Sequence, residues 1–536
     1  RFESRGLGDV YKRQTGDSIY ISTRFGNVSQ LHVVDQPGGA RKQITFFDEP
    51  VGSMSRQPDG TLIAFTMDVG GSEHAQILLL NPENGSSTML SDGNSRHGSP
   101  LWDKTGEHIA FMSNRRNGAS NDVWTMPIDN PDQAEMVLES PDGTWWGPID
   151  WSNDGKHLLI QNYISITNSK VYLVDLETKE KRLILGNLAE PSVNSGLAFD
   201  ATNTGVFFTT DTFAEFNQLA HKNLVTGEVT IISQDINWDV DGFAISSDGK
   251  RAAFKVNENG FSALYLLNTQ TLQYQQVEDL PMGLVGGMQF NEAGSQLGLS
   301  LNTYQSPSDT YTLALSRNPL RHKDLVRWTQ SEVGGLDTST FVEPQLITYS
   351  TFDNRNIPAF VYTKPSREPQ PVIIYIHGGP EGQSRPSFSS TFQLWIDQLG
   401  ATVITPNVRG SEGYGKTYLG LDNGFQREDS VKDIGALLDW IAQQPDLDAS
   451  RVAVYGGSYG GYMVLASAVH YSERLSAAID IVGISNFVTF LKNTKDYRRD
   501  LRRVESGDER DPALREFFEK ISPNNNVDKI TVPMFV

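Results

Sequence analysis

The sequence contains no cysteine among its 536 residues. Disulfide bonds, thiolate catalysis and cysteine-ligated metals are therefore excluded. It also lacks an apolar run near the roughly 20 residues that a membrane-spanning helix needs, so we expect no membrane partner. Basic residues are in deficit: 45 Lys and Arg against 65 Asp and Glu give a net charge of −20. This charge argues against a nucleic-acid partner, and we expect neither a metal nor a cofactor.

The length predicts two or more domains. Residues 1–14 are set aside, because Asp-Val-Tyr-Lys-Arg-Gln at 9–14 is what GAT GTG TAT AAG AGA CAG encodes, a string similar to a sequencing adapter. We interpret residues 1–14 as a read-through artefact, the alternative being a native polar terminus. On the artefact interpretation the native start is missing, and localisation stays open between cytoplasm and periplasm. Homo-oligomerisation also stays open.

A glycine followed by an apolar strand recurs every 44 to 50 residues through the first two thirds of the chain. The glycines are Gly16, Gly60, Gly106, Gly155, Gly205, Gly249 and Gly294. A second apolar strand follows most of them, and helical periodicity is missing. Seven such units predict a seven-bladed β-propeller over residues 15–338.

Aromatic residues precede several of these glycines. We interpret Trp102, Trp151 and Phe290 as blade core, the alternative being ligand contacts. Trp145 and Trp146 lie in a loop-like Pro-Asp-Gly-Thr-Trp-Trp-Gly-Pro segment at 141–148, where a packed blade edge or a channel lining is open.

Strands alternate with helices from residue 339 onward. Buried-type strands are expected at 371–376, 401–405, 452–455 and 477–482, and helices at 391–399, 430–443 and 462–470. This alternation predicts a mostly parallel sheet covered on both faces. The fold class is therefore multi-domain, β plus α/β.

The segment Gly-Gly-Ser-Tyr-Gly-Gly at 456–461 has the pattern of a nucleophile elbow. It stands between an apolar strand and an apolar helix, and glycines two before and two after Ser458 keep side chains out of the tight turn. The helix N-terminus offers the backbone N–H of Tyr459 to a developing oxyanion. These features predict Ser458 as a catalytic nucleophile on an α/β-hydrolase sheet.

Two further motifs make the pattern specific. His-Gly-Gly-Pro at 377–380 and Asn-Val-Arg-Gly-Ser-Glu-Gly-Tyr-Gly at 407–415 follow the first and second buried strands. Together with the elbow they resemble the prolyl oligopeptidase family of serine peptidases, and His-Gly-Gly-Pro resembles its acylaminoacyl-peptidase branch. The resemblance implies a propeller followed by an α/β-hydrolase domain over residues 339–536, lacking its C-terminal part.

The resemblance assigns roles position by position. It implies that Ser458 is the nucleophile and that the backbone N–H groups of Tyr459 and Gly379, in the Gly378-Gly379 turn, are oxyanion donors. Arg409 and Tyr414 are interpreted as structural supports, and His377 as part of the oxyanion loop rather than a base.

The sequence offers no clear candidates for the acid and the base of a catalytic triad. This fold orders them after the serine, and of the nine histidines only His470 follows Ser458. It lies twelve residues along the helix, roughly 18 Å away at 1.5 Å per residue. Asp480 is a poor substitute for the acid, because it lies inside a strand. The resemblance therefore implies that the Asp and His lie beyond residue 536, so we expect the 536-residue chain to be inactive.

The segment from residue 484 to 526 is implied by the resemblance to shape the specificity pocket. Phe487, Phe490 and Tyr497 could contribute apolar walls, with helix packing as the alternative. The arginines at 498, 499, 502 and 503 could meet a peptide carboxylate, but the neighbouring acidic residues favour a solvated salt-bridge cluster.

Three functions remain open. The first is a serine peptidase that cleaves short peptides, or blocked N-terminal residues, through an acyl-enzyme. The second is an esterase on the same scaffold, since the elbow serves either bond. The third is a propeller binding module with an inactive hydrolase domain.

Overall fold

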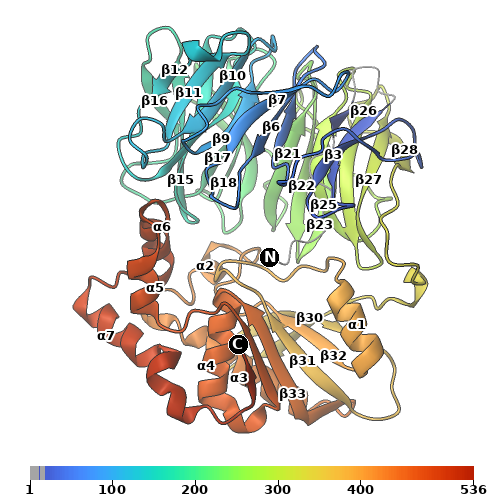
Figure 1. The fold of residues 1–536 in the computed structure, drawn as a ribbon, viewed down its shortest axis with the longest axis vertical. Coiled ribbons are helices and arrows are strands. Elements are labelled where there is room, and N and C mark those ends of the chain that lie inside the picture. Colours follow the sequence, from blue (N-terminus) through green and yellow to red (C-terminus); the bar gives the residue numbers. More distant parts are fainter. Residues whose placement is uncertain (1–10, 13–17) are drawn as a thin grey trace. The chain divides into compact units, whose positions relative to one another are not determined.

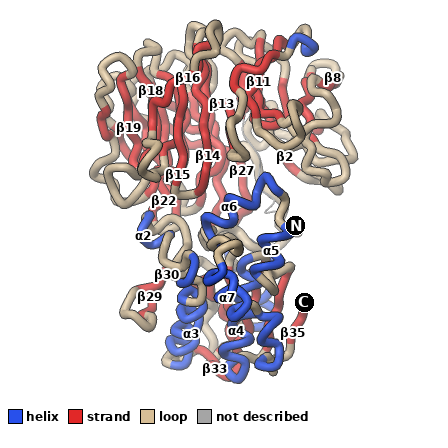
Figure 2. Tube along the Cα trace, turned by 90° about the vertical axis from the view of Figure 1, so that its left-hand side faces the viewer, coloured by secondary structure: helices blue, strands red, loops and turns tan. Residues whose placement is uncertain are grey.

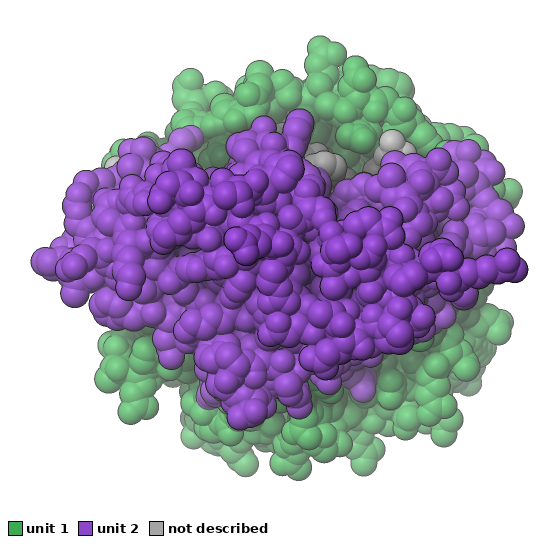
Figure 3. Space-filling view, turned by 90° about the horizontal axis from the view of Figure 1, so that it is seen from below, with its two compact units in different colours: residues 1–257, 262–302, 307–332 green, residues 258–261, 303–306, 333–536 purple. Residues whose placement is uncertain are grey.

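The computed structural model describes residues 11–12 and 18–536, without the side chains of 11–12 and 496–498. Two compact units divide the chain: unit 1 is 1–257, 262–302 and 307–332, and unit 2 is 258–261, 303–306 and 333–536. Figure 3 colours these two units separately. Residues 1–14, interpreted as a read-through artefact, lie almost wholly outside the described residues, so that interpretation stays a prediction. The predicted domain bounds also stay predictions.

Unit 1 is a seven-bladed β-propeller, as the repeat predicts (Figure 1). Each blade is a four-stranded sheet whose strands are consecutive in sequence and antiparallel where their pairing is described. The strands of the first four blades are β1 (Tyr11–Lys12), β2 (Ile19–Thr23), β3 (Gln30–Val34) and β4 (Lys42–Gln43); β5 (Met54–Arg56), β6 (Ile63–Met67), β7 (Gln76–Leu80) and β8 (Ser87–Met89); β9 (His97–Trp102), β10 (His108–Ser113), β11 (Asp122–Pro127) and β12 (Glu135–Leu138); β13 (Trp145–Trp151), β14 (His157–Ser165), β15 (Asn168–Asp175) and β16 (Lys181–Leu185). The strands of the last three are β17 (Asn194–Phe199), β18 (Gly205–Thr210), β19 (Gln218–Asn223) and β20 (Val229–Ile231); β21 (Asp239–Ile245), β22 (Arg251–Glu258), β23 (Phe261–Asn268) and β24 (Tyr274–Gln276); β25 (Leu284–Phe290), β26 (Gln296–Thr303), β27 (Ser306–Leu315) and β28 (His322–Arg327).

The repeated glycines do not all have the same backbone conformation. Four of them, at 106, 155, 249 and 294, have positive φ and occupy the left-handed turn position. In two repeats the residue at positive φ is instead a short polar one, Asp59 (51°) or Asn203 (61°), which tolerates this conformation better than most side chains. Gly205 therefore begins strand β18 and is not the turn residue that the repeat predicts.

The aromatic residues before the turns belong to the blade core, as predicted. Trp102, Trp151 and Phe290 are 5%, 4% and 7% exposed. The indole N–H of Trp102 donates to the Ser55 carbonyl at 3.0 Å, and that of Trp151 to the Leu101 carbonyl at 3.1 Å. Each hydrogen bond reaches back to the preceding blade, so these tryptophans also join neighbouring blades.

The segment predicted to be loop-like at 141–148 is partly strand, because β13 begins at Trp145. Trp146 is buried and packs against Tyr172 with ring centroids 5.0 Å apart. This favours packing between strands over a channel lining for Trp146.

The ring of blades closes through side chains. Trp328, just after the last strand, packs with Ile19, Ile21 and Val34 of the first blade. Its carbonyl accepts a hydrogen bond from the Gly38 N–H at 3.0 Å. Each blade is continuous in sequence, so this packing ties together the two ends of the propeller.

Unit 2 contains a seven-stranded sheet in the order β29-β30-β32-β31-β33-β34-β35. The strands are β29 (Gln345–Ser350), β30 (Asn356–Tyr362), β31 (Gln370–Ile376), β32 (Thr402–Pro406), β33 (Leu447–Gly457), β34 (Ala477–Ile481) and β35 (Met534–Phe535). The first two pairings are antiparallel and the others are parallel. This is the α/β-hydrolase arrangement that strand-helix alternation predicts.

Helices cover both faces of this sheet (Figures 1 and 2). They are α1 (Ser390–Leu399), α2 (Lys416–Leu419), α3 (Asp429–Ala442), α4 (Tyr459–Tyr471), α5 (Phe487–Asn493), α6 (Asp496–Ser506) and α7 (Pro512–Ile521). Alternate residues of β30 enter different cores: Val361 joins the one beneath α3 and α4, and Phe360 and Tyr362 join the one beneath α1. Side chains of a strand point to opposite faces in turn, which explains this division.

Candidate active site

Ser458 lies between β33 and helix α4, where the elbow pattern predicts it. Its backbone has φ 58° and ψ −121°, a conformation that non-glycine residues rarely adopt and that costs of order 1–3 kcal/mol. Its N–H donates to the Ile481 carbonyl at 2.9 Å on the adjacent strand, and this bond helps to hold the turn. The side chain is exposed, so its hydroxyl is presented to solvent at the carboxyl edge of the sheet.

The glycines around Ser458 are required by backbone contacts. A methyl group on Gly460 would lie 2.2 Å from the Ile376 carbonyl oxygen, and one on Gly456 would lie 2.4 Å from the Gly460 oxygen. Side-chain carbons do not approach backbone oxygens so closely. At Gly457 the nearest atom would be 3.6 Å away, which is ordinary contact. The two positions flanking the serine at i−2 and i+2 are therefore sterically fixed, whereas Gly457 is not.

The two predicted oxyanion donors come from different segments. Tyr459 is the first residue of α4, so its N–H has no partner within the helix. The second segment follows β31, and a methyl group on Gly378 would be 3.5 Å from Ser458 Cβ and 3.9 Å from its Oγ. Gly379 follows with φ 143°. The Gly378-Gly379 turn thus passes directly beside Ser458.

His377 anchors this turn and is engaged at both ring nitrogens. Nδ1 is 2.8 Å from the Gly378 carbonyl, and Nε2 is 2.8 Å from the Ser411 hydroxyl. A carbonyl can only accept, so Nδ1 carries the proton. Burial lowers the pKa of His377. The Ser411 hydroxyl lies between His377 Nε2, at 2.8 Å, and the Val408 carbonyl, to which it donates at 2.7 Å. This supports a structural place for His377 in the oxyanion loop.

The phenol of Tyr459 enters a buried polar group behind the elbow. Its hydroxyl is 3.1 Å from Asp422 Oδ2, 3.3 Å from Arg427 Nη1 and 3.1 Å from the Ser430 hydroxyl. Arg427 is fully buried and pairs with Asp422 at 2.6 Å. Burial is the main cause that raises the pKa of Tyr459, which keeps the phenol protonated as a donor. The sequence patterns did not single out Asp422 or Arg427, because neither belongs to a recognised motif.

The loop after β32 is held by ion pairs of the buried Arg409 and by a hydrogen bond from an amide side chain. Arg409 is 2.9 Å from Asp433 and 3.1 Å from Asp353, and its guanidinium lies over the Phe352 ring. The hydroxyl of Tyr414 accepts a hydrogen bond from the Asn407 side-chain amide at 2.9 Å. These contacts support the interpretation of Arg409 and Tyr414 as structural supports.

The two histidines of unit 2 and the candidate acid do not complete a triad. His470, near the far end of α4, has its Nε2 2.8 Å from Glu428. Asp480 is 3% exposed, and burial raises its pKa. Methyl groups on Gly461 and Gly483 would each lie within 2.4 Å of its Oδ1. Asp480 is thus enclosed by the backbone behind α4.

The predicted pocket residues differ in their surroundings. Phe487 is fully buried and packs against Tyr462 and Phe518, which favours helix packing for this residue. Phe490 is half-buried at the edge of the same core. The side chain of Tyr497 lies outside the described residues. A pocket role for the three stays a prediction.

The arginine-rich helix α6 forms salt bridges rather than an open cationic patch. Arg503 binds Glu509 through two bonds of 2.9 and 2.6 Å, and Arg502 pairs with Glu505 at 2.7 Å. Arg510 pairs with Asp508. These pairs support the salt-bridge interpretation of this segment.

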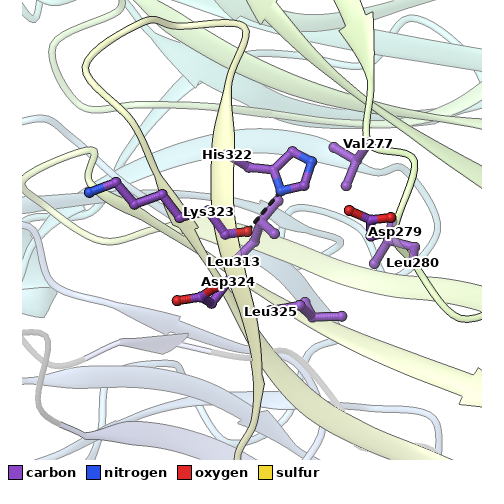
Figure 4. A pocket seen from close by; sticks show the side chains of 8 residues that line it. All are labelled: Val277, Asp279, Leu280, Leu313, His322, Lys323, Asp324 and Leu325. Carbon is purple, nitrogen blue, oxygen red and sulfur yellow. Dashed lines mark hydrogen bonds between the residues drawn. The ribbon is translucent and has the colours of Figure 1, made fainter.

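A pocket of about 270 Å³ lies in the propeller, beside β28 and the turn after β24 (Figure 4). Its lining residues are Val277, Asp279, Leu280, Leu313, His322, Lys323, Asp324 and Leu325. Nδ1 of His322 is 2.9 Å from the Lys323 carbonyl oxygen, and no serine lines this pocket.

Among the described residues no group of His, Asp or Glu is arranged to hold a metal ion, and no helix has the length and apolarity to cross a membrane.

Comparison with known proteins agrees with this geometry. The model of the prolyl oligopeptidase N-terminal β-propeller domain matches residues 45–317, and the model of the prolyl oligopeptidase family matches residues 386–536. Dipeptidyl aminopeptidase BIII of Pseudoxanthomonas mexicana is 23% identical over 99% of this chain and 72% of its own length. Dipeptidyl-peptidase 5 of Porphyromonas gingivalis is 22% identical over 80% of this chain and 63% of its own length.

Solved structures share the fold at low identity. A puromycin-hydrolyzing peptidase of Mycobacterium tuberculosis superposes with a TM-score of 0.84 at 16% identity, covering 99% of this chain and 85% of that one. A prolyl endopeptidase superposes with a TM-score of 0.83 at 16% identity, covering 97% and 78%. The propeller model matches just over half of this chain, and the peptidase-family model matches it up to its last residue. This chain therefore belongs to the prolyl oligopeptidase family of serine peptidases.

Proposed function

We propose that this chain is the nucleophile-bearing part of a peptidase that cleaves short peptides, or removes blocked N-terminal residues, through an acyl-enzyme on Ser458. The observation that carries the proposal is the exposed Ser458 at φ 58°, with the glycine turn after β31 directly beside it. Strained backbone at an exposed serine is expected where the strain serves chemistry. The names of the relatives, which include dipeptidyl peptidases, support short peptides as substrates.

In this proposal Ser458 Oγ attacks the scissile carbonyl carbon and loses its proton to a base. The carbonyl electron pair moves onto oxygen, and the oxyanion is bound by the N–H groups of Tyr459 and Gly379. Removing one such donor costs about 3–4 kcal/mol of transition-state stabilisation. Collapse of the intermediate breaks the C–N bond, and the amine leaves with the proton from the base. Water then releases the acyl group by the same steps.

The base and the acid are proposed to come from residues that follow Val536 in a longer form of the protein. Within unit 2, His377 is engaged by Gly378 and Ser411, and His470 by Glu428. We therefore expect little or no triad-dependent turnover from residues 1–536 alone. The acylaminoacyl-peptidase-like specificity is proposed from the His-Gly-Gly-Pro motif.

A fluorophosphonate probe and two substrates test this proposal. We expect a longer chain that carries the Asp and His to be labelled at Ser458 and to hydrolyse a peptide p-nitroanilide, and the 536-residue chain to react slowly. Ser458→Ala should abolish both reactions, whereas Ser476→Ala, at an exposed serine of the same unit, should not. Hydrolysis of p-nitrophenyl esters without any peptide hydrolysis would contradict the proposal and favour an esterase.

A further inference from the structure

Glu381 places a carboxylate in the interior immediately after the proposed oxyanion loop. The residue is 8% exposed, and its Oε1 is enclosed without a hydrogen-bond partner. Its backbone touches the loop itself, because a methyl group on Gly379 would lie 2.5 Å from the Glu381 nitrogen. Glu381 follows the loop by two residues, and an enclosed carboxylate oxygen without a partner needs a physical explanation.

The charges around Glu381 are paired without it. Arg427 binds Asp422 at 2.6 Å, and Arg502 of α6 binds Glu505 at 2.7 Å. The Arg502 guanidinium also lies 3.5 Å from the Gly379 carbonyl, so α6 reaches the same loop. Each arginine thus has its own carboxylate. Glu381 is the remaining negative charge in the group.

Burial of an unpaired, charged carboxylate is unfavourable in free energy, and a bound proton removes that charge. Burial, and then the negative charge of Glu505, raise the pKa of Glu381 to about 7, against the opposing influence of its own backbone N–H and of Arg427. Asp422 adds to the increase. Near neutral pH the site is therefore poised to exchange its proton for another cation. A glutamine would fill the same space without this cost, so charge is the property that distinguishes Glu381.

We propose that Glu381, assisted by Glu505, binds a cationic group of the peptide substrate, either its free α-ammonium or a basic side chain next to the scissile bond. The inference rests on the proposed peptidase function of Ser458. The chain spans about 3.5 Å per residue, and Glu381 adjoins the loop that would hold the scissile carbonyl oxygen. The cation therefore belongs to one of the two residues nearest that bond. The Glu505 side chain is 12% exposed and Glu381 is 8% exposed, so solvent reaches this pair from the side of Glu505.

Substrate charge provides the test, with the longer chain that carries the triad. Three p-nitroanilides are compared: acetyl-leucine, which is neutral, acetyl-lysine, with a basic side chain, and leucine, with a free α-ammonium. We expect Glu381→Gln to lower kcat/KM about tenfold or more for at least one of the two cationic substrates and to leave the neutral one within twofold. A loss confined to acetyl-lysine identifies the side chain as the ligand, and a loss confined to leucine identifies the α-ammonium.

The pH profile separates recognition from a structural effect. In the parent, the ratio of kcat/KM for the preferred cationic substrate to that for the neutral one should increase as pH rises through about 7, because deprotonation creates the binding charge. For the leucine substrate the ratio should fall again above about pH 8, where its α-ammonium loses its proton. In Glu381→Gln this ratio should be flat. Glu516→Gln, an exposed carboxylate on α7, is the matched control and should behave like the parent.

Equal changes for all three substrates, or no change, would overturn the inference while leaving the peptidase function intact. If the parent hydrolyses none of the three and Ser458 is not labelled, the proposed function itself fails. Glu505→Gln provides an independent second variant, for which we expect a smaller loss in the same direction.

Discussion

The hydroxyl of Tyr459 donates to Oδ2 of Asp422 at 3.1 Å, and both residues are almost fully buried. Tyr459 directly follows Ser458, so its main chain belongs to the elbow. Its side chain is held by Asp422, which lies 37 residues earlier in the sequence. Arg427 completes the arrangement by binding Asp422 and by donating to the Glu505 carbonyl at 2.6 Å. The N-terminus of α4 is therefore held from behind as well as by the turn itself.

Tyr459→Phe tests this support. Loss of the hydroxyl removes its hydrogen bond to Asp422, and we expect a decrease of about 1–2 kcal/mol in the free energy of unfolding. We also expect lower kcat with nearly unchanged KM in the triad-containing chain, because the N–H of Tyr459 acts on the transition state. Tyr471→Phe, at the other end of α4, removes only a 3.4 Å bond to the Val431 carbonyl and is the control. Equal effects of the two variants would argue against the support.

Gly460→Ala should be far more damaging than Gly457→Ala. The added methyl group meets the Ile376 oxygen at 2.2 Å and the His377 oxygen at 2.8 Å in the first case, but only ordinary contacts of 3.6 and 3.9 Å with Ile481 in the second. Backbone oxygens cannot move aside without shifting β31, so we expect a loss of about 3 kcal/mol for Gly460→Ala. Gly457→Ala should change stability by roughly 0.5 kcal/mol or less. Denaturant midpoints measure both, and similar midpoints would contradict the steric account.

Glu381→Gln should stabilise the protein at alkaline pH and not at acidic pH. The pKa of Glu381 rises from 4.5 to about 7 on folding, so the folded state binds more protons than the unfolded state between these values. Stability due to this group therefore decreases as pH rises from about 4.5 to about 7. The glutamine variant lacks this loss, and we expect it to exceed the parent by about 3 kcal/mol at pH 8.

The pH series itself contains the control for that variant. At pH 4 the two proteins should unfold at nearly the same denaturant concentration, since Glu381 is then protonated in both states. Glu516→Gln should follow the parent throughout. A pH-independent difference between Glu381→Gln and the parent would mean that the side-chain amide, rather than the charge, changes stability. Stability gained together with lost selectivity for cationic substrates would identify a charge kept for function.

Trp328→Ala should destabilise the propeller through its ring closure. The indole is 5% exposed, packs on Ile19, Ile21 and Val34, and donates to the Thr312 hydroxyl at 2.9 Å. Truncation of a buried tryptophan costs about 3–5 kcal/mol, and here it also releases the first blade from the last. Trp124→Ala, at a half-buried tryptophan inside one blade, should cost less. Thermal unfolding of both variants, followed by tryptophan fluorescence, gives the comparison.

Much of the fold follows from local patterns. The seven repeats are visible because each blade is built from consecutive strands, so strand, turn and strand recur within one stretch of sequence. The sheet of unit 2 is visible because its apolar strands and helices alternate. Where local chemistry has two solutions the pattern misleads: Asn203 takes the left-handed turn position that was assigned to Gly205. The elbow is predictable for the same local reason, since its geometry depends on the glycines adjoining Ser458.

By itself the sequence predicted two or more domains and a strained serine in the elbow, and its resemblance to the family implied the glycine turn beside that serine. Only the tertiary structure decided which charges meet behind that serine. Glu381, Arg427 and Glu505 come from three segments separated by 46 and 78 positions in the sequence, and no periodicity relates them. Whether a carboxylate is paired, and how far its pKa moves, depends on burial and on neighbours brought from elsewhere in the chain. Only folding of the chain creates that environment, and only the folded structure shows that Oε1 of Glu381 is enclosed without a hydrogen-bond partner.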